Sequence, residues 1–243
     1  MSNRTFISAC KILHLLSKKI GEKTVMNYVH TLKRIRERKT NYHKRSSLLL
    51  SKKKFITIKV TNQNILTQII EPSITGDKVI TSAHSTNLQK IGWKGSLNSL
   101  PACYLTGLLL GKKAIFKGIN NAILYTGKDT FTERISACLK GIIDGGIEIP
   151  SSQDSFPSTE RISGEHISAY ASDLKSDAGT YNKRFSTIIK NGLNPENYKS
   201  HFEECKEKIM NVDVQNFIRN ENNNVHKSIK HDKINQTDGR LTQ

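Results

Sequence analysis

The alternation of hydrophobic and polar residues in the first half of the chain predicts three short β-strands. In residues 55–60 every second side chain is isoleucine or valine, and the positions between them carry Phe55, Thr57 and Lys59. That pattern is typical of a strand with one buried face. Two more apolar runs follow at 65–70 and 79–83, each after a segment rich in turn-forming residues. We expect an antiparallel meander.

Helical periodicity replaces the alternation after the meander. Pro101 suits the first turn of a helix, which we expect to end before Gly118. Its small residues would let this helix approach a sheet closely. We then expect a buried strand at 121–126, a second helix at 132–143 and a β segment at 147–149. This order predicts an α/β fold over residues 55–150, a three-layer mixed sheet with helices on its faces. The small residues are Ala102, Gly107, Gly111 and Ala114.

Polar, helix-forming sequence follows the α/β core. We expect a helical C-terminal extension over 151–210, with helices at 160–175, 177–190 and 195–210. The last of these carries Tyr198, Phe202, Cys205 and Ile209 at helical spacing, which predicts a packed face. Residues 211–243 contain many asparagines and few apolar side chains, so we expect a largely disordered tail.

The first 32 residues have three interpretations. Residues 1–25 place apolar side chains at helical spacing among several lysines, which fits a helical extension that packs on a partner. The same basic amphipathic pattern resembles an organellar presequence or a membrane-surface anchor. Alternatively, translation starts at Met26. The apolar stretch is broken by Lys11, His14 and Ser17, which argues against a secretory signal.

Charge is the strongest functional signal in the sequence. The 243 residues carry a formal net charge of +17, with 38 Lys and Arg against 21 Asp and Glu. Sixteen of the basic residues and two of the acidic ones lie in residues 1–60. A field of this strength favours a polyanionic partner, nucleic acid first and an anionic membrane surface second. The longest apolar runs are too short to span a membrane.

Residues 33–54 form a basic N-terminal arm. Seven of the thirteen residues 33–45 are Lys or Arg, and Lys52, Lys53 and Lys54 follow. Asn41, Tyr42 and His43 lie within the run and supply hydrogen-bonding groups and a ring, which suits RNA. The alternative is a solvated face or a disordered tail. So basic a segment buries little apolar surface, so we expect it not to fold alone but to order on RNA.

Candidate catalytic groups are scattered. The strongest enzyme alternative is a metal-dependent RNA-processing nuclease, which needs convergent carboxylates. The candidates occur in turns, caps and helix ends, and His84 and His166 lack a metal-binding partner pattern. Cys103 and Cys138 lie among apolar neighbours as inert thiols, and widely spaced cysteines suggest a reducing compartment. We expect no catalytic residue, metal or cofactor. The carboxylates are Asp77, Asp129, Glu133, Asp144 and Glu148.

Several strings together resemble one protein family. The chain is similar to the archaeal and eukaryotic branch of the large-subunit ribosomal protein that binds 5S rRNA, number eighteen in the universal naming. It resembles the archaeal form, because the long eukaryotic C-terminal extension is absent. The strings occur in the family's order over about residues 33–210. They are RERKTNY at 36–42, SAHS at 82–85, GWKG at 92–95, PACYLTG at 101–107, GKKA at 111–114, LKG at 139–141, DGG at 144–146, IPS at 149–151 and RISGEHI at 161–167.

This resemblance implies a structural, non-catalytic ribosomal protein of the cytoplasm. It implies that the chain binds 5S rRNA and attaches it to the 23S-type rRNA in the central protuberance, as a single copy beside a neighbouring 5S-binding ribosomal protein. Tyr42 either stacks on a base or packs where the arm meets the sheet, and Trp93 either contacts RNA or fills the core. The matching RNA-binding positions are Lys33, Arg34, Arg36, Arg38, Lys39, Asn41, Tyr42, Lys44 and Arg45, followed by His84, Trp93 and Lys94.

Overall fold

The structure is a computed structural model that describes residues 33–37, 39–73, 76–127 and 129–211. It separates into two compact units, Met1–Thr40 and Asn41–Gln243, and the boundary falls inside the basic arm. The predictions for residues 1–32 and 212–243 lie outside the described residues.

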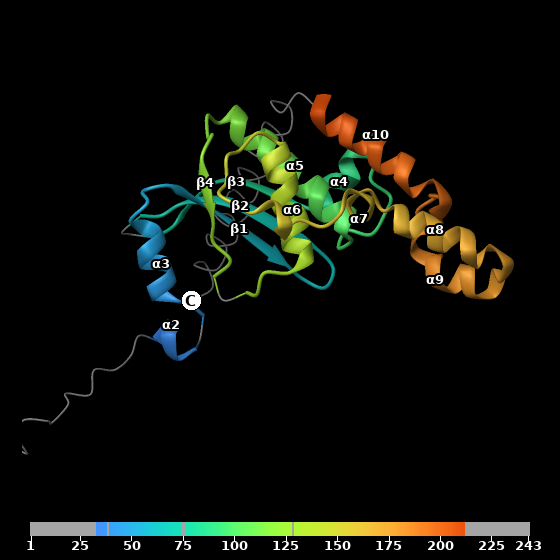
Figure 1. Ribbon diagram of the computed structural model, residues 1–243, viewed down its shortest axis with the longest axis horizontal. Helices are drawn as coiled ribbons and strands as arrows, with labels where there is room; N and C mark the ends of the chain where they lie inside the picture. The colour runs from blue at the N-terminus through green and yellow to red at the C-terminus, as the bar shows by residue number, and fades with distance from the viewer. Residues whose placement is uncertain (1–32, 38, 74–75, 128, 212–243) are drawn as a thin grey trace, which may run out of the picture. The chain divides into compact units, whose positions relative to one another are not determined.

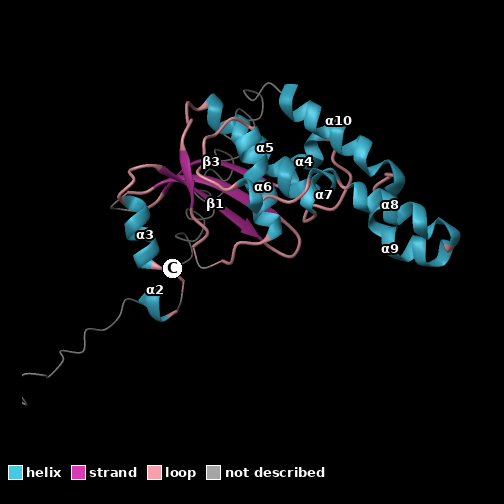
Figure 2. Ribbon diagram, in the orientation of Figure 1, coloured by secondary structure: helices cyan, strands magenta, loops and turns pink. Residues whose placement is uncertain are grey.

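A four-stranded mixed sheet forms the centre of the second unit, in the order β3-β2-β1-β4 (Figures 1 and 2). The predicted meander is confirmed, because β2 pairs antiparallel with both β1 and β3. The short β4 runs parallel to β1. The predicted β segment at 147–149 is reduced to one bridge between Asn121 and Glu148. The strands are β1 Lys54–Val60, β2 Ile65–Glu71, β3 Lys78–His84 and β4 Ala122–Leu124.

Helices surround this sheet and continue beyond it. The two core helices appear within a few residues of their predicted bounds. The predicted helix at 160–175 is broken, because Gly164 adopts φ +80° and a side chain there would collide with the ring of Tyr198. The helices of the second unit are α3 Tyr42–Leu49, α4 Thr86–Ile91, α5 Leu100–Phe116, α6 Glu133–Asp144, α7 Thr159–Ser163, α8 Glu165–Asp173, α9 Ala178–Lys190 and α10 Tyr198–Asn211.

The main core lies between the sheet and α5, α6 and α10. Ile56, Ile58 and Ile69 project from the sheet into it and are almost fully buried. The predicted packed face of α10 is confirmed, since its four apolar residues belong to the same core. A second, smaller cluster on the other side of the sheet contains Phe55, and Leu48 of α3 packs against it. Helices therefore lie on both faces, although α3 covers only one end of its face.

Two of the small residues of α5, Gly107 and Gly111, lie against α6 and the turn after it rather than against the sheet. A Cβ added to Gly107 would lie 2.1 Å from the carbonyl oxygen of Cys138, and one added to Gly141 would lie 2.2 Å from that of Tyr104. The two helix backbones therefore touch, and no side chain fits between them. Helix α5 therefore makes its close approach to α6, whereas the sequence predicted a close approach to the sheet.

Two lysines cover the edge of the sheet at β3, one within α5 and one directly after it. Lys113 is fully buried and donates from Nζ to the carbonyl oxygen of Ser82, at 3.1 Å. Lys117 Nζ donates to the carbonyl oxygen of Ile80 on the same strand. Lysine side chains at an edge strand occupy groups that would otherwise accept another strand. Two carbonyl groups that β3 could otherwise offer to another strand are therefore occupied.

Candidate nucleic-acid interface

The first unit presents a short basic helix. In α2, Lys33–Arg36, all four side chains are exposed. Arg34 Nε donates to Thr40 Oγ1 at 2.9 Å, which fixes the stem of the guanidinium. Glu37, the acid of this segment, lies 2.7 Å from Lys39 Nζ and 4.0 Å from Lys33 Nζ. These exposed ion pairs are weak, so a phosphate group can take the place of the Glu37 carboxylate beside the two lysines. Arg38 lies outside the described residues.

Helix α3 belongs to the second unit, has its own N-cap and is held to the rest of the unit by side-chain contacts. Its N-cap is Asn41, whose Oδ1 accepts from the backbone N–H of Lys44 at 3.1 Å. Lys44 Nζ donates to Thr126 Oγ1 at 3.1 Å. Leu48 packs on the small apolar cluster. The expectation that the whole arm lacks structure of its own is therefore wrong for this helix.

Arg45 also anchors α3 instead of lying free in solvent. Both ends of its guanidinium donate to the Asp77 carboxylate, and Nη1 lies 2.9 Å from Oδ2. The hydrogen bond to Asp77 raises the pKa of Arg45. The two guanidinium donors that bind the Asp77 carboxylate are the ones that would otherwise bind two oxygens of a phosphate. The expected RNA contact by Arg45 therefore competes with an intramolecular partner.

The outer side of α3 and the turn after it remain open. Tyr42 is 37% exposed as a residue, so its ring is accessible for stacking. Lys52 adopts φ +56°, an unusual conformation for a residue other than glycine. This turn directs Lys52 and Lys53 to solvent, while Lys54 at the start of β1 is half-buried.

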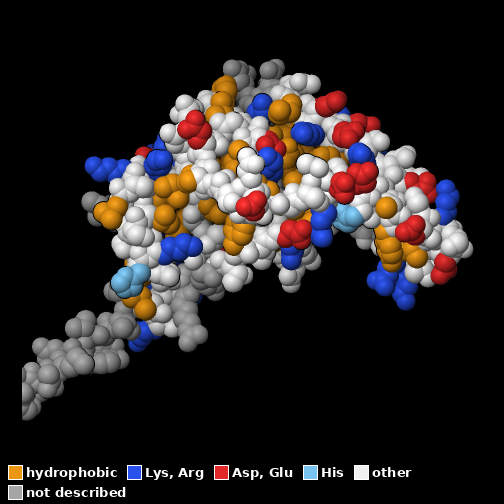
Figure 3. Space-filling view, in the orientation of Figure 1, with side chains coloured by type: hydrophobic (Ala, Val, Ile, Leu, Met, Phe, Trp, Pro, Cys, Tyr) orange, Lys and Arg blue, Asp and Glu red, His pale blue; other side chains and the backbone are white. Residues whose placement is uncertain are grey.

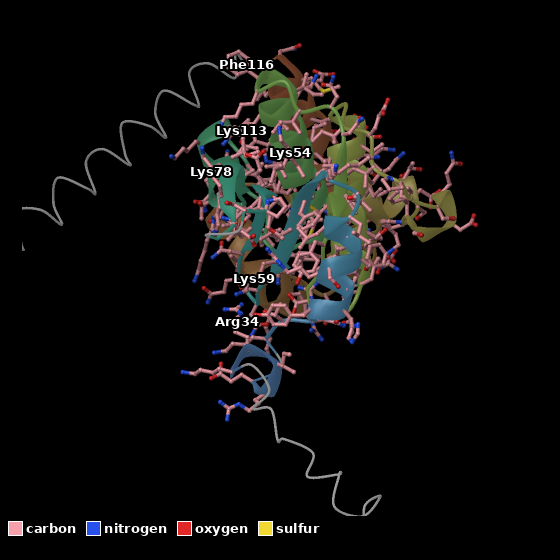
Figure 4. All side chains as sticks on the ribbon, turned by 90° about the vertical axis from the view of Figure 1, so that its left-hand side faces the viewer. Arg34, Lys54, Lys59, Lys78, Lys113 and Phe116 are labelled. Carbon is pink, nitrogen blue, oxygen red and sulfur yellow. The ribbon has the colours of Figure 1, made fainter. Side chains whose placement is uncertain are left out.

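One row of side chains across the open part of the sheet has a polar residue at each end. Lys59 pairs with Leu66, which pairs with His84, so the three side chains lie on one face. Figure 4 shows Lys54 and Lys59 at the two ends of β1. Sequence reasoning assigned no RNA contact to Lys59, although the alternation of residues 55–60 already placed it on the polar face.

His84 is oriented by the residue that begins α4. Its Nδ1 lies 3.2 Å from the backbone nitrogen of Thr86, which donates to it, and 2.8 Å from Thr86 Oγ1. Because Nδ1 accepts the backbone proton, the neutral ring carries its own proton on Nε2. Nε2–H is then a donor on the open face of the sheet, which suits the RNA contact expected of His84.

Trp93 is a core residue, so the prediction that it contacts RNA is not supported. Only 3% of the residue is exposed. Its ring lies edge-on to Tyr198, with centroids 5.5 Å apart, and stacks on His201 at 5.2 Å. The neighbouring Lys94 donates its backbone N–H to His201 Nε2 at 3.1 Å, although its side chain is exposed. The 92–95 loop therefore fastens α10 to the core.

This junction predicts a pH dependence of stability. Burial is the main cause that lowers the pKa of His201, and Lys208 and Lys94 act in the same direction, whereas Glu204 raises it. The folded state binds the proton more weakly than the unfolded state, so the His201 contribution is complete above the unfolded pKa of about 6.5 and declines below it. Urea unfolding followed by the fluorescence of the single tryptophan should show a lower midpoint at acidic pH.

A His201→Gln variant is the control for this prediction. Glutamine can still accept the Lys94 N–H but does not titrate, so the part of the pH dependence due to His201 should disappear. An unchanged pH profile in the variant would contradict a role for His201.

The carboxylates proposed for a nuclease do not converge. Asp77 binds Arg45, Glu133 lies 3.0 Å from Arg161 Nε, and Asp144 accepts from Tyr104 at 2.8 Å. Among the described residues, no three His, Cys, Asp or Glu side chains lie close enough together to hold a metal ion. The expected burial of the thiols is confirmed, and burial raises the pKa of Cys103 to about 12. No described helix is long and apolar enough to cross a membrane.

Comparisons with known proteins decide the family. A family model described as ribosomal large subunit proteins 60S L5 and 50S L18 matches residues 26–132. Large ribosomal subunit protein uL18 of Methanococcus maripaludis is 43% identical over 182 residues, covering 74% of this chain and 94% of the relative. The protein of the same name from Aeropyrum pernix is also 43% identical, over 73% of this chain and 85% of the relative. The chain belongs to the uL18 family.

Membership in the uL18 family confirms several expectations. The two relatives are archaeal, as the sequence resemblance indicated. They are large-subunit ribosomal proteins, so the family is structural rather than enzymatic and works on the ribosome of the cytoplasm. This outcome argues against the nuclease alternative. The positions at which this uL18 family member touches RNA remain predictions.

Proposed function

We propose that this chain binds 5S rRNA and attaches it to the 23S-type rRNA in the central protuberance of the large subunit, beside a neighbouring 5S-binding ribosomal protein. The observation that carries the proposal is the set of exposed cations in residues 33–53, within a family of large-subunit ribosomal proteins. Phosphates bound to these side chains release counterions, which drives association with RNA.

We expect the exposed cations of the arm to carry this function. Arg34, Arg36 and Lys39 are exposed, and Arg36 has no ion pair with a described residue. The guanidinium groups of Arg34 and Arg36 can bind phosphate through two parallel hydrogen bonds, and the Lys39 ammonium can bind it as a point charge. The open sheet face, with Lys59 and His84, supplies donors for sugar and base edges. Trp93 and Arg45 make their contacts within the protein, so we expect them to support the RNA-binding surface from inside.

Sedimentation tests the attachment of one RNA to the other. Labelled 5S rRNA is mixed with deproteinised 23S-type rRNA, with and without the full chain, and the complexes are separated on a gradient. We expect 5S rRNA to sediment with the larger RNA only when the chain is present. Sedimentation of 5S rRNA at its free position in both samples would contradict the proposal.

A further inference from the structure

Holding one RNA on another requires two separate RNA-binding surfaces. The basic residues of α3 and of the turn after it lie at one end of the second unit, and α9 lies at the opposite end (Figure 1). We propose that α9 is the second surface and contacts phosphates of the large-subunit rRNA through its outer face. This inference rests on the proposed function and adds the place of the second contact.

One face of α9 is committed to packing. Phe185 is only 6% exposed, and its ring lies 6.0 Å from that of Tyr170 in α8 and 5.3 Å from that of Tyr181. Ile188, one turn after Phe185, packs against the main core. Because the apolar stripe faces inward, the opposite face of the helix is directed to solvent.

That solvent face is cationic and hydroxylated. Lys183 and Lys190 are exposed and lie two turns apart, so their Cα atoms are about 10.5 Å apart along the axis. Ser186 and Thr187 lie between them and are also exposed. Arg184 flanks the same face. The helix itself contains no Asp or Glu. The nearby Asp177 is its N-cap and accepts a hydrogen bond from Thr180.

Some lysines of the C-terminal region are neutralised by a carboxylate, whereas the cations of α9 have no ion pair with a described residue. Elsewhere in the C-terminal region, Lys175 lies 3.1 Å from Glu196, and Lys199 lies 3.3 Å from Glu165. Lys183, Arg184 and Lys190 form no such pair. Figure 3 shows Lys and Arg side chains, together with Asp and Glu side chains, at the outer margin of the α8 and α9 region. Three unneutralised charges on one helix favour an external anion.

The chemistry of this face favours RNA over an acidic protein. The core of a protein interface is apolar and depleted of lysine. The outer face of α9 instead offers lysine ammonium groups with hydroxyls between them, the groups that typically bind phosphate and sugar. Contacts of this kind carry little sequence information, which suits the fixing of position on a large folded RNA.

Charge reversal on α9 tests the inference. We compare the full wild-type chain with the double variant Lys183→Glu, Lys190→Glu in two assays, binding to 5S rRNA alone and binding of the protein with 5S rRNA to deproteinised 23S-type rRNA. The matched control is Lys90→Glu, Lys112→Glu, which makes the same change of net charge on α4 and α5. Circular dichroism melting verifies that all three proteins fold.

We expect the α9 variant to bind 5S rRNA within about twofold of wild type and to bind the 23S-type rRNA at least about tenfold more weakly. The slope of log affinity against log salt for the larger RNA should fall by about 2, one for each lost phosphate contact. Unchanged binding of the larger RNA, equal loss on both RNAs, or equal loss in the control would overturn the inference. Failure of the wild-type chain to bind 5S rRNA would instead contradict the proposed function.

Discussion

Neutralising the first basic cluster should abolish most RNA binding while leaving the fold intact. The variant replaces Arg34, Arg36, Arg38 and Lys39 with glutamine. If each cation contacts one phosphate, four counterion-releasing contacts are lost, which corresponds to an affinity loss of about 100- to 1,000-fold near physiological salt. The free energy of unfolding should change by less than about 0.5 kcal/mol, because the described members of this set are exposed.

Filter binding to 5S rRNA at several salt concentrations measures the loss, and urea unfolding measures stability. A matched control replaces four lysines elsewhere with glutamine and should lose far less affinity. A large loss of stability in the arm variant would mean that these side chains hold the protein together. Equal losses of affinity in both variants would mean that net charge alone drives binding. The control positions are Lys90, Lys112, Lys199 and Lys206.

Adding a methyl group where α5 crosses α6 should cost more stability than any surface change. A Cβ at Gly107 or Gly141 would meet a backbone carbonyl oxygen of the other helix at 2.1 or 2.2 Å. A backbone cannot move aside as a flexible side chain can, so the helices must separate. We expect Gly107→Ala and Gly141→Ala each to lower the free energy of unfolding by about 3 kcal/mol or more.

Two further variants make this prediction specific. The double variant should lose less than the sum of the two single losses, because helices that are already separated tolerate the second methyl group. Gly179→Ala in α9 is the control, since the nearest atom to its added Cβ lies 3.6 Å away. This change should leave stability unchanged or raise it by up to about 1 kcal/mol. Losses at Gly107 and Gly141 no larger than at Gly179 would contradict the close crossing.

Local periodicity predicted most of the core fold. The alternation in residues 55–60 and the proline at the start of α5 are signals carried by neighbouring residues, and both elements appear where expected. The break at Gly164 depends on the ring of Tyr198, which lies far along the chain. The six-residue α4 was missed because its apolar positions are too few to show a period.

The candidate site was predicted by its charge but not by its contacts. The basic composition of residues 33–54 marked the arm without any structure. That Arg45 binds Asp77, and that Trp93 lies between Tyr198 and His201, depends on pairs separated by many residues. The register of the sheet was likewise needed to place Lys59 and His84 on one face of the sheet, on either side of Leu66.

A gel-shift titration tests the central claim most directly. The full chain is titrated against 5S rRNA and against an unrelated RNA of equal length, at low and high salt. The account predicts that binding to both RNAs weakens steeply with salt, because phosphate contacts supply much of the affinity. It also predicts that a preference for 5S rRNA survives at high salt. Equal affinity for the two RNAs at both salt concentrations would contradict the claim.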